Sequence, residues 1–313
     1  MCISTWTDDL PYFDGHCDTL TAMDGRYGRI CLQLEKEKYS RRGQIFAICG
    51  DISPRPMDNI FKVCLERFSR MDGVSLCRNS DEFLDAQSKG KCASILAIEG
   101  AEVIDCDSSR LEEVCNLGVK VIAPTWNIFN GLCGTAAESV NTGLTCAGVE
   151  FCDKAVSLGI LLDVSHASEA AAFEMVKRYP GNVFASHSNS YAVCPNRRNI
   201  SDELFCAIAE SGGTVGINLY APFVSQTDAD LGRVADHICH FAELTPLAFK
   251  SISLGFDLDG CDHLPKGMST SCDAHLLAYE LSCRGFDKQS IIDIFHDNLF
   301  GFIWKGRKYK CSL

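Results

Sequence analysis

The sequence lacks the features that mark nucleic-acid-binding and membrane proteins. Its 29 Lys and Arg against 41 Asp and Glu give a formal net charge of −12. This balance disfavours nucleic acid, whose affinity comes mainly from Lys and Arg that neutralise phosphates, and it disfavours an anionic membrane surface. No apolar run reaches the roughly 18 residues that a membrane-spanning helix needs. The remaining classes are an enzyme that acts on small molecules and an acidic binding protein.

Cysteine is abundant, but the spacings that would give it a defined role are missing. The 19 cysteines include no Cys-x-x-Cys pair, which zinc ribbons and thioredoxin-like redox sites need. An odd number cannot be fully paired, and the density stays below the ~8–10% of small disulfide scaffolds. We expect most of the cysteines to be reduced, small and buried, as in a cytosolic protein.

Targeting signals are also missing from the sequence. Polar and charged residues (Thr7, Asp8 and Asp9) follow Met1, in place of a basic region and an apolar region of about 7–15 residues. There is no hydrophobic C-terminal tail for a lipid anchor. We therefore expect a cytoplasmic protein without a membrane anchor.

A short apolar run that ends in a polar residue and leads into a helical pattern recurs eight times. Eight buried strands alternating with helices predict an α/β protein with a parallel sheet, and eight strands close a (β/α)8 TIM barrel. A doubly wound open sheet is the alternative, but no Gly-x-Gly-x-x-Gly follows an early strand. No linker divides the chain, so we predict one barrel domain over residues 1–313. The predicted strands are Tyr12–Phe13, Ile45–Cys49, Ser94–Ile98, Val119–Ala123, Ile160–Val164, Val183–Ser186, Thr214–Leu219 and Ile252–Phe256.

Two amphipathic segments show where helices begin and end. Ser201 and Asp202 begin a run of apolar residues at helical spacing, and Gly212–Gly213 ends it. Asp287–Phe300 also places its apolar residues on one face. Both segments lie where the alternation of strands and helices requires a helix.

Polar residues at the ends of the predicted strands predict a metal site. In a TIM barrel the side chains at the C-terminal strand ends face one mouth, where the chemistry takes place. Imidazole and carboxylate together suit zinc and similar divalent ions. Six candidate ligands are too many for one tetrahedral ion, so two ions that share a carboxylate are the natural arrangement. The candidates are His16, Asp18, Glu99, His166, His187 and Asp257.

Each candidate also has an ordinary structural interpretation. A His-x-Asp pattern occurs in many chains, a strand-end carboxylate is as often an ion-pair partner, and a lone histidine commonly belongs to the core or the surface. Their recurrence at the same end of successive strands is what favours the metal site. Arg197 and Arg198 follow in a loop at the same mouth and offer a guanidinium fork for a carboxylate; a surface charge pair is the alternative.

At these residues the chain resembles the membrane dipeptidase family, the M19 metallopeptidases of the amidohydrolase superfamily. The most specific part is Ser-His-Ser at 186–188 followed by Arg-Arg-Asn at 197–199. The matching segments keep the family's order along nearly the whole chain. They are Asp14–Asp18, Ile98–Gly100, Gly143–Thr145, Gly159–His166, Ser186–Ser188, Tyr191–Asn199, Gly212–Gly213 and Gly255–Gly260.

The resemblance implies a (β/α)8 hydrolase that cleaves dipeptides with a water activated by two Zn²⁺ ions. It implies that His16 and Asp18 bind one zinc, that His166 and His187 bind the other, and that Glu99 bridges both. A dipeptide with a D-residue at its C-terminal position falls within the expected substrate range.

The resemblance also implies roles for residues around the metals. Asp257 is the expected general base and acid, Arg198 the anchor of the substrate's C-terminal carboxylate, and Tyr220 a residue that lines the pocket. Well-studied animal members have a histidine in a Thr-His step that binds the substrate carbonyl. Here Trp126 stands in that step and Asn127 follows it, and both are assigned to substrate binding. Since an indole offers one N–H donor and no imidazolium charge, we expect this departure to bear on substrate range and rate more than on the reaction type.

Two other functions remain open as alternatives. One is a related binuclear amidohydrolase that acts on another amide, an N-acyl amino acid, a lactam or a lactone. The other is a non-catalytic metal-binding protein, which the presence of both Asp257 and Arg198 beside the ligands disfavours. Family members often dimerise, so a homodimer is expected, and the missing signal and anchor resemble the soluble bacterial members.

Overall fold

The computed structural model describes residues 10–22, 39–49 and 57–304, and eight parallel strands of this part form a nearly closed barrel. Hydrogen-bonded neighbours follow the order β7-β6-β5-β4-β2-β1-β9-β8. The two ends of this order meet where Ala185 N donates to Thr214 O at 3.0 Å and Gly216 N donates to Ala185 O at 2.8 Å. The barrel strands are β1 (Tyr12–Asp14), β2 (Arg42–Cys49), β4 (Cys92–Glu99), β5 (Val119–Ala123), β6 (Leu161–Asp163), β7 (Val183–Phe184), β8 (Val215–Ile217) and β9 (Ile252–Leu254).

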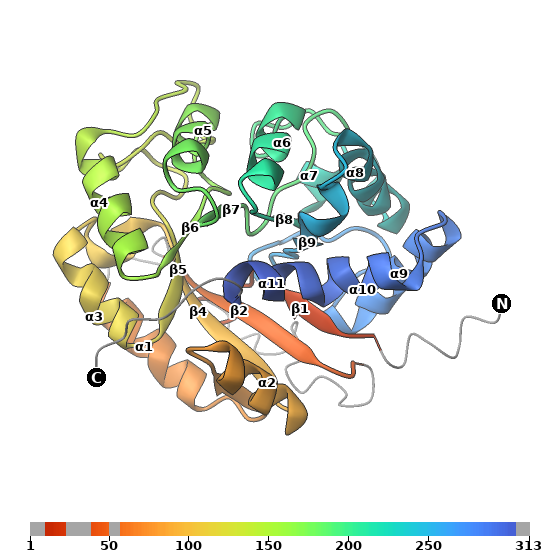
Figure 1. The fold of residues 1–313 in the computed structure, drawn as a ribbon, viewed down its shortest axis with the longest axis horizontal. Helices are drawn as coiled ribbons and strands as arrows, with labels where there is room; N and C mark the ends of the chain where they lie inside the picture. The colour runs from red at the N-terminus through yellow and green to blue at the C-terminus, as the bar shows by residue number, and fades with distance from the viewer. Residues whose placement is uncertain (1–9, 23–38, 50–56, 305–313) are drawn as a thin grey trace.

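Helices alternate with the strands and surround them (Figure 1). This arrangement confirms the predicted (β/α)8 barrel and excludes the doubly wound open sheet. Short 3-10 turns lie at Ala101–Ile104, Ser108–Arg110, Ala248–Lys250 and Ser271–Asp273. The helices are α1 (Met57–Ser69), α2 (Ser80–Ser88), α3 (Leu111–Asn116), α4 (Cys146–Ser157), α5 (Glu169–Arg178), α6 (Asp202–Glu210), α7 (Ala221–Val224), α8 (Leu231–Leu244), α9 (Ala274–Cys283), α10 (Lys288–Ile292) and α11 (Asn298–Trp304).

Each predicted strand run overlaps an observed strand, and the bounds of the fourth run match those of its strand, but the other bounds differ in two ways. The first three runs begin later than, or end before, the strands that contain them, whereas the last four extend past their strands. In those four, the final residues lie beyond the strand bounds, but some still form backbone hydrogen bonds to the neighbouring strand, such as Val164 N to Phe184 O at 2.9 Å. One strand was missed: β3 (Val74–Leu76) pairs with the start of β4 outside the eight-stranded ring. Its three residues are only half-buried and form no apolar run.

Both predicted helices are present. Ser201 caps α6 by accepting a hydrogen bond from Leu204 N at 3.2 Å, and the chain turns away at Gly212, where φ is +81°. Asp287 caps the second segment by accepting from Ser290 N at 2.7 Å. That segment is one helical run, but it contains a π-helical turn at Asp293–Asp297 and continues to Trp304 rather than Phe300.

Alternation along β4 explains why the mouth of the barrel carries a carboxylate. Ile95 and Ala97 belong to the inner hydrophobic cluster, which also contains Leu299 of α11, while Leu96 and Ile98 belong to the outer cluster with the helices. Because successive side chains on a strand point to opposite faces, Glu99 follows Ile95 and Ala97 onto the inner face. Apolar residues fill the barrel up to this level. Among the described residues, no helix is both long and apolar enough to cross a bilayer.

Candidate metal centre and substrate pocket

Three histidines from separate strand ends surround one carboxylate oxygen. Glu99 is the last residue of β4, while His16, His166 and His187 follow β1, β6 and β7. Glu99 Oε1 lies 2.8 Å from His166 Nε2, 3.5 Å from His16 Nε2 and 3.6 Å from His187 Nε2. None of the four residues is more than 5% exposed. The closed barrel therefore brings four of the predicted ligands into one buried cluster.

Two aspartates extend the cluster beside His16. His16 Nε2 lies 3.8 Å from Asp18 Oδ1 and 3.9 Å from Asp257 Oδ1. Gly260 makes room for both carboxylates, since a Cβ at this position would lie 2.3 Å from Asp18 Oδ2 and from Asp257 Oδ1. Asp257 itself has a left-handed backbone with φ of +58°, which is uncommon for a residue other than glycine. The loop after β9 thus folds tightly against the loop after β1.

The donor atoms of the cluster fit divalent metal ions. His16 Nε2, Asp18 Oδ1 and Glu99 Oε2 are buried and have no hydrogen-bond partner among the described residues. A buried polar atom without a partner costs free energy, which a bound cation would offset. Three groups have ligand atoms within 4.8 Å of one another: Glu99 with His166 and His187, His16 with Asp18 and Asp257, and His16 with Asp163 and His187. Imidazole and carboxylate donors of this kind suit zinc and related divalent ions.

Charges within the cluster shift the protonation of its members. Burial by itself lowers the pKa of His16, but nearby carboxylates, led by Glu99, raise it to about 10. Burial and the charge of Glu99 raise the pKa of Asp18 well above its ordinary value. Burial and the neighbouring Arg198 lower the pKa of His166 to about 4. The carboxylates around His16 thus favour its protonated form, whereas burial and Arg198 favour the neutral form of His166.

The imidazoles of His166 and His187 each have a partner for Nδ1, the nitrogen that does not face Glu99. His166 Nδ1 lies 3.0 Å from Asn127 Oδ1, and His187 Nδ1 lies 2.7 Å from Ser186 Oγ. Ser186 in turn donates to the buried Asp163 through its hydroxyl and, at 2.9 Å, through its backbone N–H. Such partners fix the ring orientation and leave Nε2 to face Glu99. Asn127, predicted to bind substrate, thus also contacts a predicted metal ligand, and Ser186 was missed although it lies in the Ser-His-Ser motif.

Arg198 lies on the other side of the same histidines. Its Nη2 lies 3.1 Å from the Nε2 atoms of both His166 and His187. The guanidinium carbon lies 5.4 Å from the centre of the Phe223 ring. Arg198 Nη1 is buried and has no hydrogen-bond partner among the described residues. A guanidinium with an unused donor next to the cluster is suited to bind a carboxylate.

The cluster opens into a pocket of about 640 Å³. Trp126 packs against the His166 ring with centroids 6.0 Å apart and planes inclined by 30°, while Tyr220 and Phe223 form an edge-to-face pair 4.8 Å apart. Carboxylates and aromatic rings thus both border the pocket. The predicted residues that line it are Asp18, Glu99, His166, Asp257, Arg198, Tyr220, Trp126 and Asn127.

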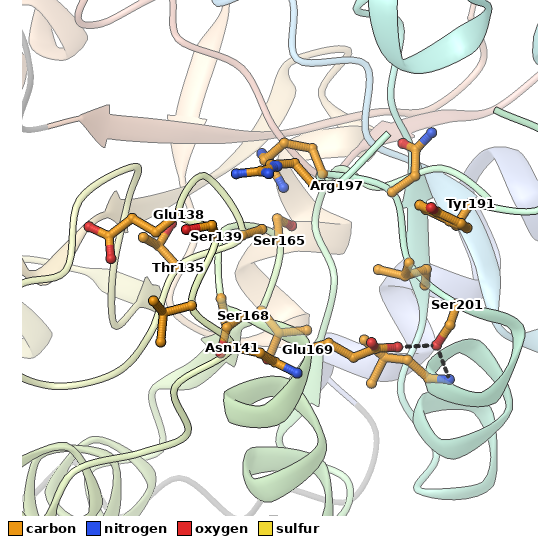
Figure 2. A pocket seen from close by; sticks show the side chains of 18 residues that line it. Thr135, Glu138, Ser139, Asn141, Ser165, Ser168, Glu169, Tyr191, Arg197 and Ser201 are labelled. Atoms are coloured by element: carbon orange, nitrogen blue, oxygen red, sulfur yellow. Dashed lines mark hydrogen bonds between the residues drawn. The ribbon is translucent and has the colours of Figure 1, made fainter. Parts of the chain in front are cut away.

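A second pocket of about 350 Å³ adjoins Arg198 and lies between the first turns of α5 and α6 (Figure 2). Ser165 and Ser168 are buried in its wall, and Glu138, Tyr191 and Arg197 are exposed at its edge. Of the residues that line the two pockets, Arg198 alone lines both. This residue therefore lies between the pocket at the cluster and a smaller one that is lined in part by hydroxyl groups.

A barrel that gathers histidines and carboxylates at its strand ends is the architecture of a metal-dependent hydrolase. The sequence profile described as membrane dipeptidase (peptidase family M19) matches residues 57–308, more than half of the chain. The chain therefore belongs to the membrane dipeptidase family, as predicted. The matched region begins after His16 and Asp18, which the structure nevertheless places at the cluster.

Curated relatives agree with this membership. The chain is 32% identical over 217 residues to dipeptidase aclJ of Aspergillus oryzae, covering 68% of this chain and 51% of that protein. It is 30% identical over 231 residues to an uncharacterised protein in the pqqA 5′ region of Klebsiella pneumoniae, covering 70% and 84%. An uncharacterised dipeptidase of Schizosaccharomyces pombe, C3A11.10c, is 30% identical over 68% of this chain and 53% of that protein. The chain thus spans about half the length of the two fungal relatives.

Solved structures share the fold over nearly their whole length. The metallopeptidase of Rhodobacter sphaeroides, solved with a phosphinate mimic of the dipeptide L-Ala-D-Ala, superposes with a TM-score of 0.81 at 24% identity and covers 95% of this chain and 99% of that one. Dipeptidase AC, a metallopeptidase of family M19, superposes with a TM-score of 0.79 at 25% identity and covers 94% and 98%.

Proposed function

We propose that the protein is a dipeptidase that uses two Zn²⁺ ions to hydrolyse the peptide bond of dipeptides. The observation that carries the proposal is Glu99, whose Oε1 lies within 3.6 Å of three imidazole nitrogens from three other strand ends. The Rhodobacter metallopeptidase, solved with a mimic of L-Ala-D-Ala, supports dipeptides as the substrate class and a D-residue at the C-terminal position. Family membership supports the same reaction.

The donor set divides between two ions. His16 and Asp18 would hold one ion, His166 and His187 the other, and Glu99 would contact both. The unpartnered atoms of His16, Asp18 and Glu99 support this division. When bound, such a pair of ions lowers the pKa of water toward about 7 and polarises the scissile carbonyl.

Asp257 would move the proton that the reaction transfers. Burial raises its pKa, so the carboxyl takes up a proton more readily than an exposed aspartate. In hydrolysis the water oxygen bonds to the carbonyl carbon and the C–N bond breaks. A proton that the water loses passes through Asp257 to the leaving nitrogen, and Asp257 returns to its starting form.

Arg198 would bind the C-terminal carboxylate of the dipeptide. Because it lies next to His166 and His187, it sets a fixed distance between the carboxylate and the bond that is cleaved. Trp126 and Tyr220 would contact the side chains of the substrate, since both line the pocket. A substrate longer than two residues would place its carboxylate beyond this guanidinium.

The test is hydrolysis of a panel of L-L and L-D dipeptides by protein that has been chelated and by protein reconstituted with zinc. We expect cleavage of both stereochemical classes only after reconstitution, with two zinc ions per chain. An Asp257→Asn variant should keep both ions and lose most of its turnover. Two bound ions without dipeptide cleavage would instead favour the alternative amidohydrolase substrates, N-acyl amino acids and lactams. Trp126, which stands where animal relatives have a histidine, is the residue that favours this alternative.

A further inference from the structure

We infer that Asn218 is a positioning residue that holds Asp257 in the orientation its proton transfer requires, and that Asn189 fixes Asn218 in turn. This inference rests on the proposed function, because it assigns Asp257 the proton transfer. Neither asparagine belongs to the predicted metal ligands or substrate contacts. Both are fully buried, with 0% of their surface exposed.

The contact with Asp257 is direct and uses one oxygen. Asn218 Nδ2 donates to Asp257 Oδ2 at 3.0 Å, while Asp257 Oδ1 lies 3.9 Å from His16 Nε2. The two carboxylate oxygens therefore have different surroundings: Oδ2 is held by an amide, and Oδ1 faces the cluster. The hydrogen bond to Oδ2 opposes rotation of the Asp257 side chain away from the cluster.

The orientation of the Asn218 amide is determined by its other partners. Asn218 Oδ1 accepts a hydrogen bond from Tyr220 N, so Nδ2 is the end that faces Asp257. The backbone is held as well: Asn218 N donates to Asn189 Oδ1 and Asn189 Nδ2 donates to Asn218 O, both at 3.0 Å. Residues after β7, β8 and β9 are thus joined in one chain of hydrogen bonds that ends at the carboxylate.

A neutral amide suits a group that must take up and release a proton. A lysine or arginine partner would favour the charged carboxylate strongly and oppose its protonation. The amide of Asn218 donates to Oδ2 whether or not Oδ1 carries a proton, so the side chain stays in place through both states. Packing alone would allow an apolar side chain of the same size here, whereas this role requires the amide of asparagine.

The experiment compares an amide with an ester of the same shape: L-alanyl-L-alanine, and L-alanyl-L-lactate, in which alanine is esterified to the lactate hydroxyl. Asn218→Leu removes the amide at similar volume, while Asn189 still binds the backbone at this position. We expect kcat for the dipeptide to fall about 10- to 100-fold and kcat for the ester to fall much less, because an amine leaves only when protonated. The zinc content and the KM for the dipeptide should not change.

Asn199→Leu is the matched control. Asn199 is also a buried asparagine, but its Nδ2 donates to the backbone oxygens of Cys194 and Phe223 at 2.8 Å. We expect this variant to lose stability and to keep the wild-type ratio of amide to ester turnover. If Asn218→Leu does not fold, Asn218→Ala, which cannot overpack the site, gives the same comparison.

The outcomes separate the inference from the proposed function. Equal losses on amide and ester in the Asn218 variant, or the same change of ratio in Asn199→Leu, would overturn the positioning role. Full dipeptide turnover by Asp257→Asn would overturn the proton-transfer role itself. Loss of turnover in Asp257→Asn together with an unaltered Asn218 variant would leave the proposed function standing and reject only the inference.

Discussion

Arg198 is the only lysine or arginine among the described residues that line the 640 Å³ pocket. We expect Arg198→Ala to raise the KM for L-alanyl-L-alanine by about 10- to 100-fold, the loss that corresponds to a charged hydrogen bond of roughly 1.5–3 kcal/mol. The amide of the same dipeptide, which lacks the carboxylate, should be affected little. The comparison is made with kcat and KM for both substrates. The neighbouring Arg197 is exposed and donates to Ala137 O at 2.8 Å, so Arg197→Ala is the control. Equal losses on both substrates in Arg198→Ala would contradict its role as a carboxylate anchor.

Glu99 is the residue on which the proposed metal centre depends most. Glu99→Gln keeps the size of the side chain but replaces a carboxylate oxygen with an amide nitrogen, which cannot bind a cation. We expect the variant to lose bound zinc, measured by elemental analysis after dialysis against metal-free buffer. Glu138→Gln, an exposed glutamate at the edge of the second pocket, should keep the wild-type zinc content. Two ions per chain in Glu99→Gln would show that no carboxylate at this position bridges them.

At the scale of the elements, strand ends were predictable and the contacts between loops were not. The run Ser94–Ile98 predicted a buried strand that leads to Glu99, because a short apolar run that ends in a polar residue is visible in the sequence itself. Asn218 lies within another predicted run, Thr214–Leu219, yet its importance depends on Asp257, which follows the next strand and lies 39 residues further along the chain. No local pattern distinguishes an asparagine that contacts a carboxylate from one that satisfies backbone groups.

Helix α8 is joined to the loops at the mouth by a buried histidine. Ser190 N donates to His237 Nδ1 at 3.1 Å, and His237 Nε2 lies 3.0 Å from Val224 O, so the ring is neutral with its proton on Nε2. Burial lowers the pKa of His237 to about 4. Between about pH 6.5, the ordinary pKa of histidine, and about pH 4, the His237 imidazole therefore binds a proton in the unfolded state but not in the folded state. The contribution of His237 to the free energy of unfolding is fully present above about pH 6.5. It is lost as the pH is lowered toward 4, by up to about 3 kcal/mol.

The measurement is the free energy of unfolding in urea at several pH values from about 7.5 down to the acid limit of folding. His237→Gln should lower stability near neutral pH and should flatten the dependence between about pH 6.5 and 4. The histidines of the metal cluster titrate in both proteins, so the difference between the two curves isolates His237. Parallel curves for wild type and variant would show that His237 does not contribute to the pH dependence.

For the whole molecule, the number of strands was predictable from the sequence. The contacts between residues that are far apart in the sequence were not, because they form only when the barrel closes. Eight alternating units predicted the (β/α)8 architecture and the mouth at which the candidate ligands meet. The sequence could not show that Gly260 packs against Asp18, because Asp18 lies near the start of the chain and Gly260, with Asp257, near its end. Such a contact exists only after β1 and β9 have become neighbours. The same closure places the Asn127 amide against His166.

Because the candidate ligands lie at or just after the ends of β1, β4, β6 and β7, bound ions would link strands from most of the circumference of the barrel. An ion that binds the folded chain alone stabilises it by about 4 kcal/mol when its free concentration is 1,000 times its Kd. We therefore expect chelation to lower the Tm and added zinc to restore it. Cysteine thiols such as Cys146 and Cys283 are exposed and offer zinc other binding sites. Glu99→Gln separates the two contributions, because a zinc-dependent rise in Tm that persists in this variant would place the stabilising ions away from the strand ends.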